Sequence, residues 1–408
     1  MTCSAKTTLR RSDIRRRPAI SFPALPGRAF WLGLGLRLSL AGSLLAAPAV
    51  IAAPNPIQND FSDDAVLATL PDVSPNLNSV PRNVDELADE VQQLIGQARK
   101  TGDPRFLGYA ERLLQDWPEA DFTDRLRVLR ATLAQSLHRF DAARRDLEQV
   151  LQTTEQRQQQ IQSRLTLANL ELVQGRYTNA HEHCQALANV YPGLIAASCL
   201  AQTEARTGDA ESAYRRLRAQ LASASNADPT SRLWAEGILG DLAAQLGLDS
   251  AAVHWGSVLQ HSPDDLYTRA QLADWHLQTG NPQATLALTD GYGPVDALAA
   301  RRAIARPEAG APEAEALTSS LRERFAEAQW RGTLLHQRDF ARFQLDIENR
   351  PTLALKHALA NWETQREPQD TRLVLRAAHQ AEDQPALQKL RQWLAEFNQA
   401  DHRYPEAP

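Results

Sequence analysis

One pattern recurs along this chain at intervals of 33 to 39 residues, and it restricts the fold more than any other feature. In each copy a turn residue stands between two small residues, one seven places before it and one about five places after it. The turn residues are His138, Gly175, Gly208, Gly247 and Gly280. The small residues are Ala131, Ala168, Ala201, Gly240 and Ala273 before them, and Ala143, Ala180, Ala213, Ala252 and, less regularly, Thr285 after them. A period of this length predicts repeated supersecondary units.

Each unit predicts a helical hairpin. Two helices can cross closely only where their side chains are small, and the turn residue ends the first helix in a left-handed conformation. A single hairpin buries one apolar face and leaves another exposed, so successive hairpins must stack. Ala, Leu, Gln, Glu and Arg dominate the middle of the chain and clusters of β-branched residues are almost absent, which favours helices over strands.

The order of small residue, turn, aromatic, small residue and proline resembles the tetratricopeptide repeat, most closely in LVQGRYTNAHEHCQALANVYP around Gly175. Residues 84–398 also resemble a family of exported bacterial tetratricopeptide proteins, through GDPRFLGYAERLL, LRATLAQSLHRFDAA and HALANWETQREPQDTRLVLRAA. The resemblance implies an all-α, right-handed tetratricopeptide-like solenoid of about nine helical hairpins, and it implies no particular activity. An irregular helical bundle is the alternative.

The repeat pattern and its breaks predict the domain organisation. Residues 84–305 form a first solenoid block and 306–400 a second, separated by the Pro- and Gly-containing break ARPEAGAPEAEA. Outside the clear repeats we expect helices at 84–100 with 103–117, 295–305 with 312–330, 335–348 with 351–363, and 370–381 with 384–398. The last helix carries a stripe of Leu387, Leu390, Leu394 and Phe397 beside a polar face, as a terminal cap requires. Residues 54–83 are a Pro- and Asn-rich linker, and 401–408 are a short polar tail.

The first 53 residues predict an export signal. They carry eight cations and one anion, and they end in an uncharged apolar stretch, 38–53, that is short for a membrane span. Small residues suit cleavage near Val50 or Pro54. The alternative is an uncleaved inner-membrane anchor. We therefore expect the protein in the periplasm or cell envelope, or anchored to the inner membrane and facing the periplasm, with no other membrane contact.

The rest of the chain is acidic and has no recognisable catalytic motif. Residues 54–408 carry 36 cations and 48 anions, so nonspecific binding of nucleic acid through a basic face is not expected. Phosphate loops, dinucleotide glycine patterns, nucleophile elbows and zinc-protease motifs are absent. The sequence therefore predicts a non-catalytic scaffold without cofactor or metal that binds a protein or peptide partner. A binder of envelope polysaccharide and a self-assembling structural component are alternatives, and the partner's identity and the oligomeric state are not predicted.

In tetratricopeptide superhelices the first helix of each hairpin lines the concave groove. The resemblance therefore implies that residues following the small position of each first helix face the groove here. Trp234 and Tyr267, earlier on their helices, add aromatic contacts. The surface is rich in amides, which suits an extended peptide, although the same residues could be ordinary solvated faces. The predicted partner-binding residues are Thr132, Gln135, Ser136, Asn169, Leu172, Val173, Gln202, Arg206, Trp234, Asp241, Gln245, Tyr267, Asp274 and Gln278.

Cys184 and Cys199 lie at equal distances from the Tyr191–Pro192 turn, on helices expected to be antiparallel neighbours. This placement predicts a disulfide in an oxidising compartment; two buried thiols are the alternative. His181 and Cys184 share a helix face but His183 does not, so we expect surface histidines and no metal site.

Overall fold

The computed structural model describes residue 81 and residues 83–405, except 307–311, 333 and 335–336. The predicted signal segment (1–53), nearly all of the predicted linker and residues 406–408 lie outside these described residues. Throughout the described ranges the only regular elements are eighteen α-helices and one short 3₁₀ turn, Glu119–Asp121. None of these helices is long and apolar enough to span a bilayer.

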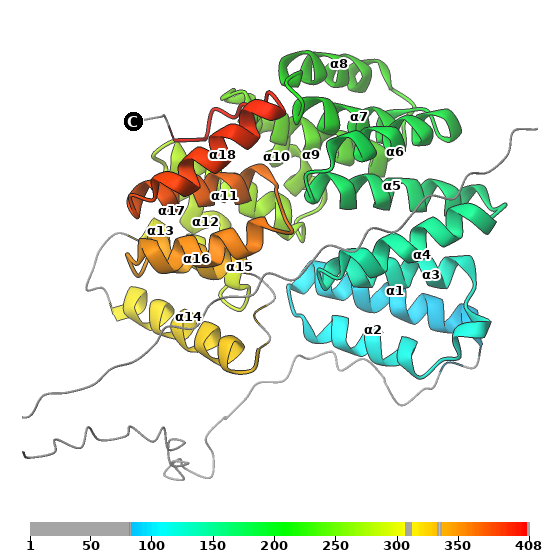
Figure 1. Ribbon diagram of the computed structural model, residues 1–408, viewed down its shortest axis with the longest axis horizontal. Coiled ribbons are helices and arrows are strands. Elements are labelled where there is room, and N and C mark those ends of the chain that lie inside the picture. Colours follow the sequence, from blue (N-terminus) through cyan, green and yellow to red (C-terminus); the bar gives the residue numbers. More distant parts are fainter. Residues whose placement is uncertain (1–80, 82, 307–311, 333, 335–336, 406–408) are drawn as a thin grey trace, which may run out of the picture. The chain divides into compact units, whose positions relative to one another are not determined.

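Consecutive helices pair as nine hairpins, which confirms the predicted all-α repeat fold (Figure 1). The pairs are α1 (Val84–Thr101) with α2 (Arg105–Gln115), α3 (Asp124–Ser136) with α4 (Phe140–Thr153), α5 (Arg157–Val173) with α6 (Tyr177–Val190), α7 (Leu194–Ala205) with α8 (Ala210–Ser223), α9 (Pro229–Gln245) with α10 (Ser250–His261), α11 (Leu266–Gln278) with α12 (Pro282–Leu288), α13 (Asp296–Ala305) with α14 (Pro312–Trp330), α15 (Gln337–Asp346) with α16 (Pro351–Trp362), and α17 (Pro368–Gln380) with α18 (Gln384–Glu396).

The predicted turn residues end the first helices of their hairpins. All five have positive φ, and His138, at 57°, is the one that is not glycine. The small residues Ala168 and Ala180 are buried where α5 and α6 cross, as predicted. In the α11–α12 hairpin Thr285 takes the small position, and its hydroxyl donates to the carbonyl of Ala273 at 2.9 Å. A buried hydroxyl fits here because the opposite helix supplies its acceptor.

The α9–α10 hairpin departs from the predicted register by one residue. We expected Ala252 at the helix crossing, but Ala251 is the fully buried residue and Ala252 is only partly buried. The reason is Trp255, whose ring lies against Gly240 so closely that a Cβ there would be 2.5 Å from the indole. The bulky indole therefore sets the rotation of α10.

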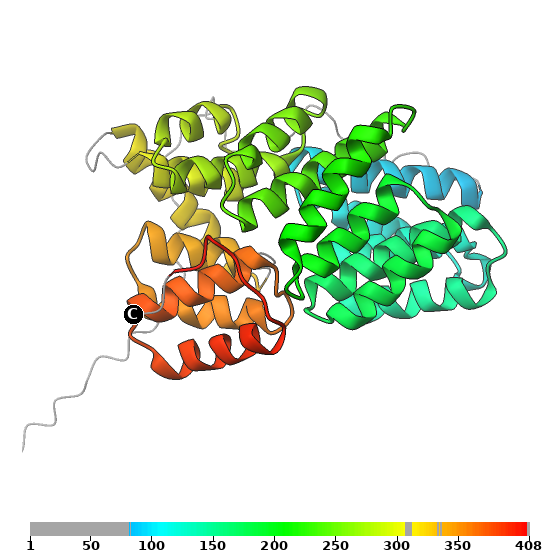
Figure 2. The ribbon, with the colours of Figure 1, turned by 90° about the horizontal axis from the view of Figure 1, so that it is seen from above.

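Apolar side chains form several clusters between successive hairpins. This is the distribution expected of stacked units that contact mainly their neighbours. One cluster breaks the rule, because it joins Tyr177 of α6 to residues of α15 to α18 such as Trp362 and Trp393. The orange-to-red C-terminal helices accordingly lie beside the green central repeats in both Figure 1 and Figure 2.

We call residues 362–404 the C-terminal closure, because they lie across the turns of three central hairpins. The amide of Arg366 donates to the carbonyl of Val173 at 2.6 Å, and the amide of His402 donates to the carbonyl of Gln245 at 2.8 Å. At the middle turn, a Cβ on Gly208 would meet the side chain of Asn398. The predicted cap helix α18 does bury Leu387 and Leu390. It also contacts Tyr177 through Phe397, at 5.1 Å between ring centroids, so its far end packs on an earlier repeat.

Candidate protein-binding groove

The first helices of the N-terminal half line a groove of about 820 Å³. Residues of α1, α3, α5, α7 and α9 face it, as the tetratricopeptide-like packing of first helices predicts. Four predicted partner-binding residues are among its walls: Thr132, Gln135, Asn169 and Trp234. The groove is large enough to hold several residues of an extended chain, because sites for drug-sized ligands occupy roughly 300–1,000 Å³.

Amide side chains in the groove are available to a ligand. Gln135, Gln158 and Asn169 make no side-chain hydrogen bond with any residue that the structure describes, and each is at least partly exposed. An amide can donate and accept, so it matches the alternating N–H and C=O groups of an extended backbone. Apolar side chains between them would receive alternate side chains of such a segment. These are Ile95, Val128, Leu129, Ile161, Leu165 and Ile195.

The groove contains one uncompensated cation. Arg125 donates to Asp89 at 2.6 Å and to Gln92 at 2.9 Å. Asp228 caps α9, where hydrogen bonds from the hydroxyl and amide of Ser231 lower the pKa of its carboxyl. Arg99 has no ion pair or hydrogen bond in the described part of the chain; it is exposed at the groove, and partial burial lowers the pKa of its guanidinium. The groove therefore favours a ligand with a negative group near Arg99.

Trp234 stands at the edge of the groove and of the core. It is half-buried, and it packs on the apolar clusters on both sides of α9. Its indole nitrogen is buried and has no acceptor among the described residues. The ring thus presents an edge to the groove while its body supports the fold.

The C-terminal closure packs on four other predicted partner-binding positions, Leu172, Val173, Arg206 and Gln245, and buries the last of them. Val173 gives its carbonyl to Arg366, and Leu172 packs on the C-terminal cluster. The side-chain amide of Gln245 donates to the carbonyls of Ala205 at 2.9 Å and Ala400 at 2.8 Å. It also accepts from Arg206 at 2.7 Å. The prediction treated these positions as an open concave face and was wrong about their surroundings, because a distant part of the same chain covers them.

The remaining predicted positions are divided between buried polar contacts and the surface. Asp241 accepts from Trp255 and from Tyr267, each at 3.1 Å. Asp274 pairs with Arg301 at 2.6 Å, and Gln278 lines a cavity too small for a peptide. Ser136 donates to the carbonyl of Thr132 within its own helix, and Gln202 is partly exposed; neither lines the groove.

Several groove residues were missed by the sequence prediction. On α5 we selected positions after Ala168, but Gln158, Gln162 and Leu165 before it face the same groove. The helical period of 3.6 residues contained this signal, because these positions continue the face of Asn169 toward the start of the helix. Arg99 could not be found in this way, since α1 lies outside the clear repeats.

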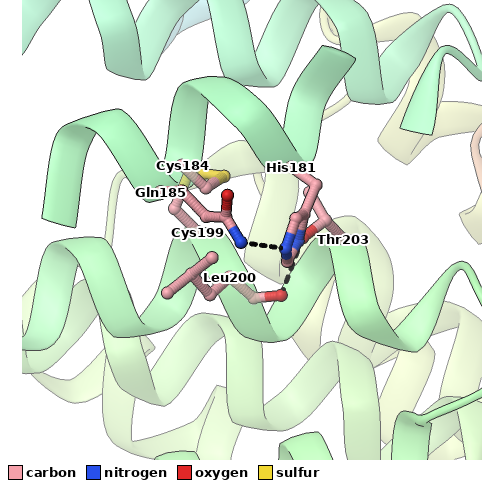
Figure 3. The surroundings of a disulfide bond; sticks show 6 residues. All are labelled: His181, Cys184, Gln185, Cys199, Leu200 and Thr203. Atoms are coloured by element: carbon pink, nitrogen blue, oxygen red, sulfur yellow. Dashed lines mark hydrogen bonds between the residues drawn. A yellow bond between two sulfur atoms is a disulfide. The ribbon is translucent and has the colours of Figure 1, made fainter. Parts of the chain in front are cut away.

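A disulfide joins Cys184 of α6 to Cys199 of α7, with Cα atoms 5.5 Å apart (Figure 3). His181 lies beside it, and its Nδ1 is 3.2 Å from the hydroxyl of Thr203. Because that hydroxyl donates to the carbonyl of Leu200, Nδ1 must be the donor, and Nε2 accepts from the amide of Gln185. Both ring nitrogens of His181 thus have protein partners. The described residues contain no cluster of His, Cys, Asp or Glu suited to a metal ion.

Comparison with known proteins gives distant structural similarity only. No protein-family model matches the chain, and no curated protein matches it either. Yeast Tom70 is 13% identical over 77% of this chain and 75% of its own, with a TM-score of 0.40. The tetratricopeptide domain of P58(IPK) is 16% identical over 74% of this chain and 89% of its own, with a TM-score of 0.20. The repeat fold of this protein is therefore identified by its own nine hairpins in the described residues.

Proposed function

We propose that this protein is a non-catalytic scaffold of the periplasm or cell envelope that binds an extended segment of a protein partner in its N-terminal groove. The groove carries the proposal, because it combines free amides, apolar walls and the unpaired cation of Arg99. The basic and apolar N-terminal sequence supports export. The disulfide between Cys184 and Cys199 fits an oxidising compartment.

A protein segment suits the groove better than a polysaccharide. Sugars stack on the open faces of aromatic rings, and the aromatic residues in the groove walls are Tyr191 and Trp234. Trp234 uses much of its ring in the core. The amides and aliphatic side chains instead match backbone groups and side chains of a peptide.

Site-specific photocrosslinking in cells that make the full chain tests the proposal. A photoreactive amino acid at Gln162 or Asn169, in the groove, should give the same protein adduct. The same amino acid at Val253, which is 72% exposed on α10, should not. Arg99→Glu should abolish the adduct, and Arg145→Glu, at an exposed position on α4 outside the groove, should preserve it. Equal labelling from Val253, or an adduct unaffected by Arg99→Glu, would contradict groove binding.

A further inference from the structure

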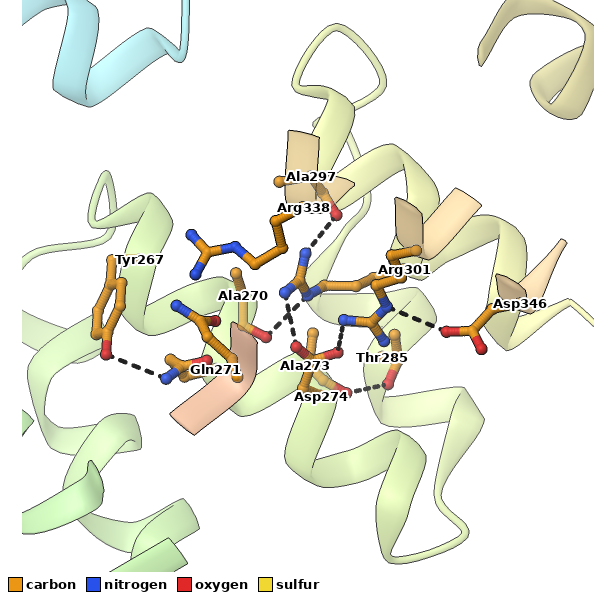
Figure 4. A network of polar contacts seen from close by, with 12 residues as sticks. Tyr267, Ala270, Gln271, Ala273, Asp274, Thr285, Ala297, Arg301, Arg338 and Asp346 are labelled. Carbon is orange, nitrogen blue, oxygen red and sulfur yellow. Dashed lines mark hydrogen bonds and ion pairs between the residues drawn. The ribbon is translucent and has the colours of Figure 1, made fainter. Parts of the chain in front are cut away.

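The first helices of the C-terminal half carry a dense set of charges instead of an open groove. Two adjoining cavities of about 30 and 20 Å³ lie among α11, α13, α15 and α17, and Asp274, Gln369 and Arg372 line both. Figure 4 shows Asp274 beside Arg301, with Asp346 joined to the same network and Arg338 lying nearby. Five arginines and two carboxylates line the larger cavity.

Nearly every arginine around these cavities has a carboxylate partner. Arg301 pairs with Asp274 and also donates to the carbonyls of Ala270 and Ala297. The other pairs are Arg342 with Asp274 and Asp346, Arg376 with Asp346, Arg338 with Glu367 and Asp370, and Arg403 with Asp401. These carboxylates are therefore already engaged.

Arg372 is the exception. Its guanidinium makes no hydrogen bond or ion pair with any described residue, and its Nε is buried without an acceptor. The side chain is half-buried, and its neighbouring charges are the cations Arg342, Arg376 and Arg403 and the carboxylate of Asp274, which Arg301 and Arg342 already pair. Burial, together with these like charges, lowers the pKa of Arg372 to about 10. A partly desolvated cation with free N–H groups beside a cavity can bind a further anion.

The size of the cavities restricts the anion. The larger cavity has room for about two water molecules and the smaller one for about one. A chloride ion, or a carboxylate inserted from outside, is of this size, whereas a phosphate ester is larger. Asp339 lines the larger cavity but not the smaller one, and its charge acts on Arg301, Arg338 and Arg342. The end shared by both cavities lies away from Asp339, and its one carboxylate, Asp274, is already paired with Arg301 and Arg342, so an anion is favoured there beside Gln369 and Arg372.

We propose that the cavity at Arg372 binds one small monovalent anion, either free chloride or a carboxylate presented by another chain. Arg372 supplies the charge-assisted hydrogen bonds, and the lining of the larger cavity carries five arginines against two carboxylates. The site is separate from the N-terminal groove and does not depend on the proposed function.

Chloride binding to the full chain tests this site. At constant ionic strength, with bulky gluconate as the replacement anion, the chloride NMR line should broaden in excess with the wild-type protein. Arg372→Gln should remove the excess broadening, and Arg145→Gln, an exposed arginine on α4, should leave it unchanged. Saturating chloride should raise the unfolding midpoint by about 2–4 °C in the wild type only.

Asp339→Asn provides a second variant if Arg372→Gln does not fold. Loss of this carboxylate should tighten chloride binding about severalfold, because it removes a like charge from the same cavity. Displacement of chloride by acetate would favour a partner's carboxylate as the natural ligand, and failure of acetate to compete would favour the free ion. If the wild type shows no excess broadening with chloride and no stabilisation by acetate, the cavity holds only water and the proposal is wrong. Chloride binding unchanged by Arg372→Gln would overturn it equally.

Discussion

The carboxyl group of Asp241 sits where α9, α10 and α11 meet. Burial raises its pKa from the ordinary value of 3.8 to about 6, although Arg403 and Arg206 oppose the shift. The indole of Trp255 and the hydroxyl of Tyr267 donate to its two oxygens. Its ionisation therefore weakens the folded state even though both oxygens are hydrogen-bonded.

The raised pKa of Asp241 predicts the direction of a pH effect. The folded chain holds the proton of the Asp241 carboxyl more tightly than the unfolded chain. Protonation of Asp241 therefore stabilises the fold fully below about pH 4, and this contribution is lost as the pH rises to about 6. The free energy of unfolding of the wild type should fall relative to Asp241→Asn across this window and stay level above it. Denaturant titrations from pH 4 to pH 8 measure this difference. The same titrations on Asp264→Asn, at an exposed carboxylate between α10 and α11, serve as the control.

The disulfide between Cys184 and Cys199 closes a loop with a sequence separation of 15. In the chain-entropy description, a loop of this length adds about 3 kcal/mol to the free energy of unfolding. Reduction of the disulfide should lower the free energy of unfolding by about this amount, as should the paired change Cys184→Ala with Cys199→Ala. Denaturation with and without reductant measures the difference, and the double variant should no longer respond to reductant. Free, alkylatable thiols at both positions in unreduced protein would show that the bond does not form.

At the scale of single elements, α9 offers two glycines with opposite surroundings. Gly240 lies against the ring of Trp255, and Gly237, one turn earlier, has no atom within 4 Å of the position of an added Cβ. Gly240→Ala should lower the free energy of unfolding by about 1–3 kcal/mol, because the added methyl overpacks the helix crossing. Gly237→Ala should raise it by about 0.5–1 kcal/mol, because alanine is the better helix former. Thermal or chemical unfolding of both variants checks the pair, and two changes of the same sign would contradict the close crossing.

The positions of the helices could be predicted from the sequence because their signals are local. The prediction placed one helix at 312–330, where α14 begins and ends, and another at 84–100, one residue shorter than α1. Small residues, caps and turn glycines act within a few positions, so one sequence contains them. The error at Ala252 arose from Trp255, a large residue whose packing the small-residue pattern does not include.

The candidate site could be predicted only in part. The residues of α3 and α5 that face the groove follow from helix periodicity, as with Thr132 and Asn169. The burial of Gln245 does not, because its partner Ala400 is 155 residues away. No local pattern indicates which distant segment returns to cover a given repeat. Arg99 and Arg372 were missed for the same reason, because their lack of partners depends on how distant segments pack and not on the local sequence.

At the scale of the whole described chain, the C-terminal closure changes how the repeats depend on one another. A simple solenoid unfolds from its ends, because each unit contacts only its neighbours. Here Tyr177 donates weakly to the carbonyl of Arg366, and its hydroxyl accepts from Gln399, so α6 depends on residues more than 180 positions away. We therefore expect the central hairpins and the C-terminal closure to unfold together.

Deletion of residues 398–408 tests this coupling. The variant loses the bonds of Gln399, Ala400 and His402 to the central repeats. Amide hydrogen exchange should quicken at the turns around Gly175, Gly208 and Gly247, and stay unchanged in α1 and α2. If residues 398–408 only pack on repeats that are already stable, amide exchange at these three turns will be the same in the variant and in the full chain. Equal acceleration in α1 would instead indicate general destabilisation.

The order in which the chain is synthesised gives this closure a further importance. Gln399 follows Tyr177 by 222 positions, so it leaves the ribosome long after the repeat that it supports. The early hairpins can fold as they emerge, whereas the central ones must wait for partners still being translated. Under the export proposed above, the same order would apply beyond the membrane, where the central hairpins would gain their C-terminal partners only after nearly the whole chain has crossed.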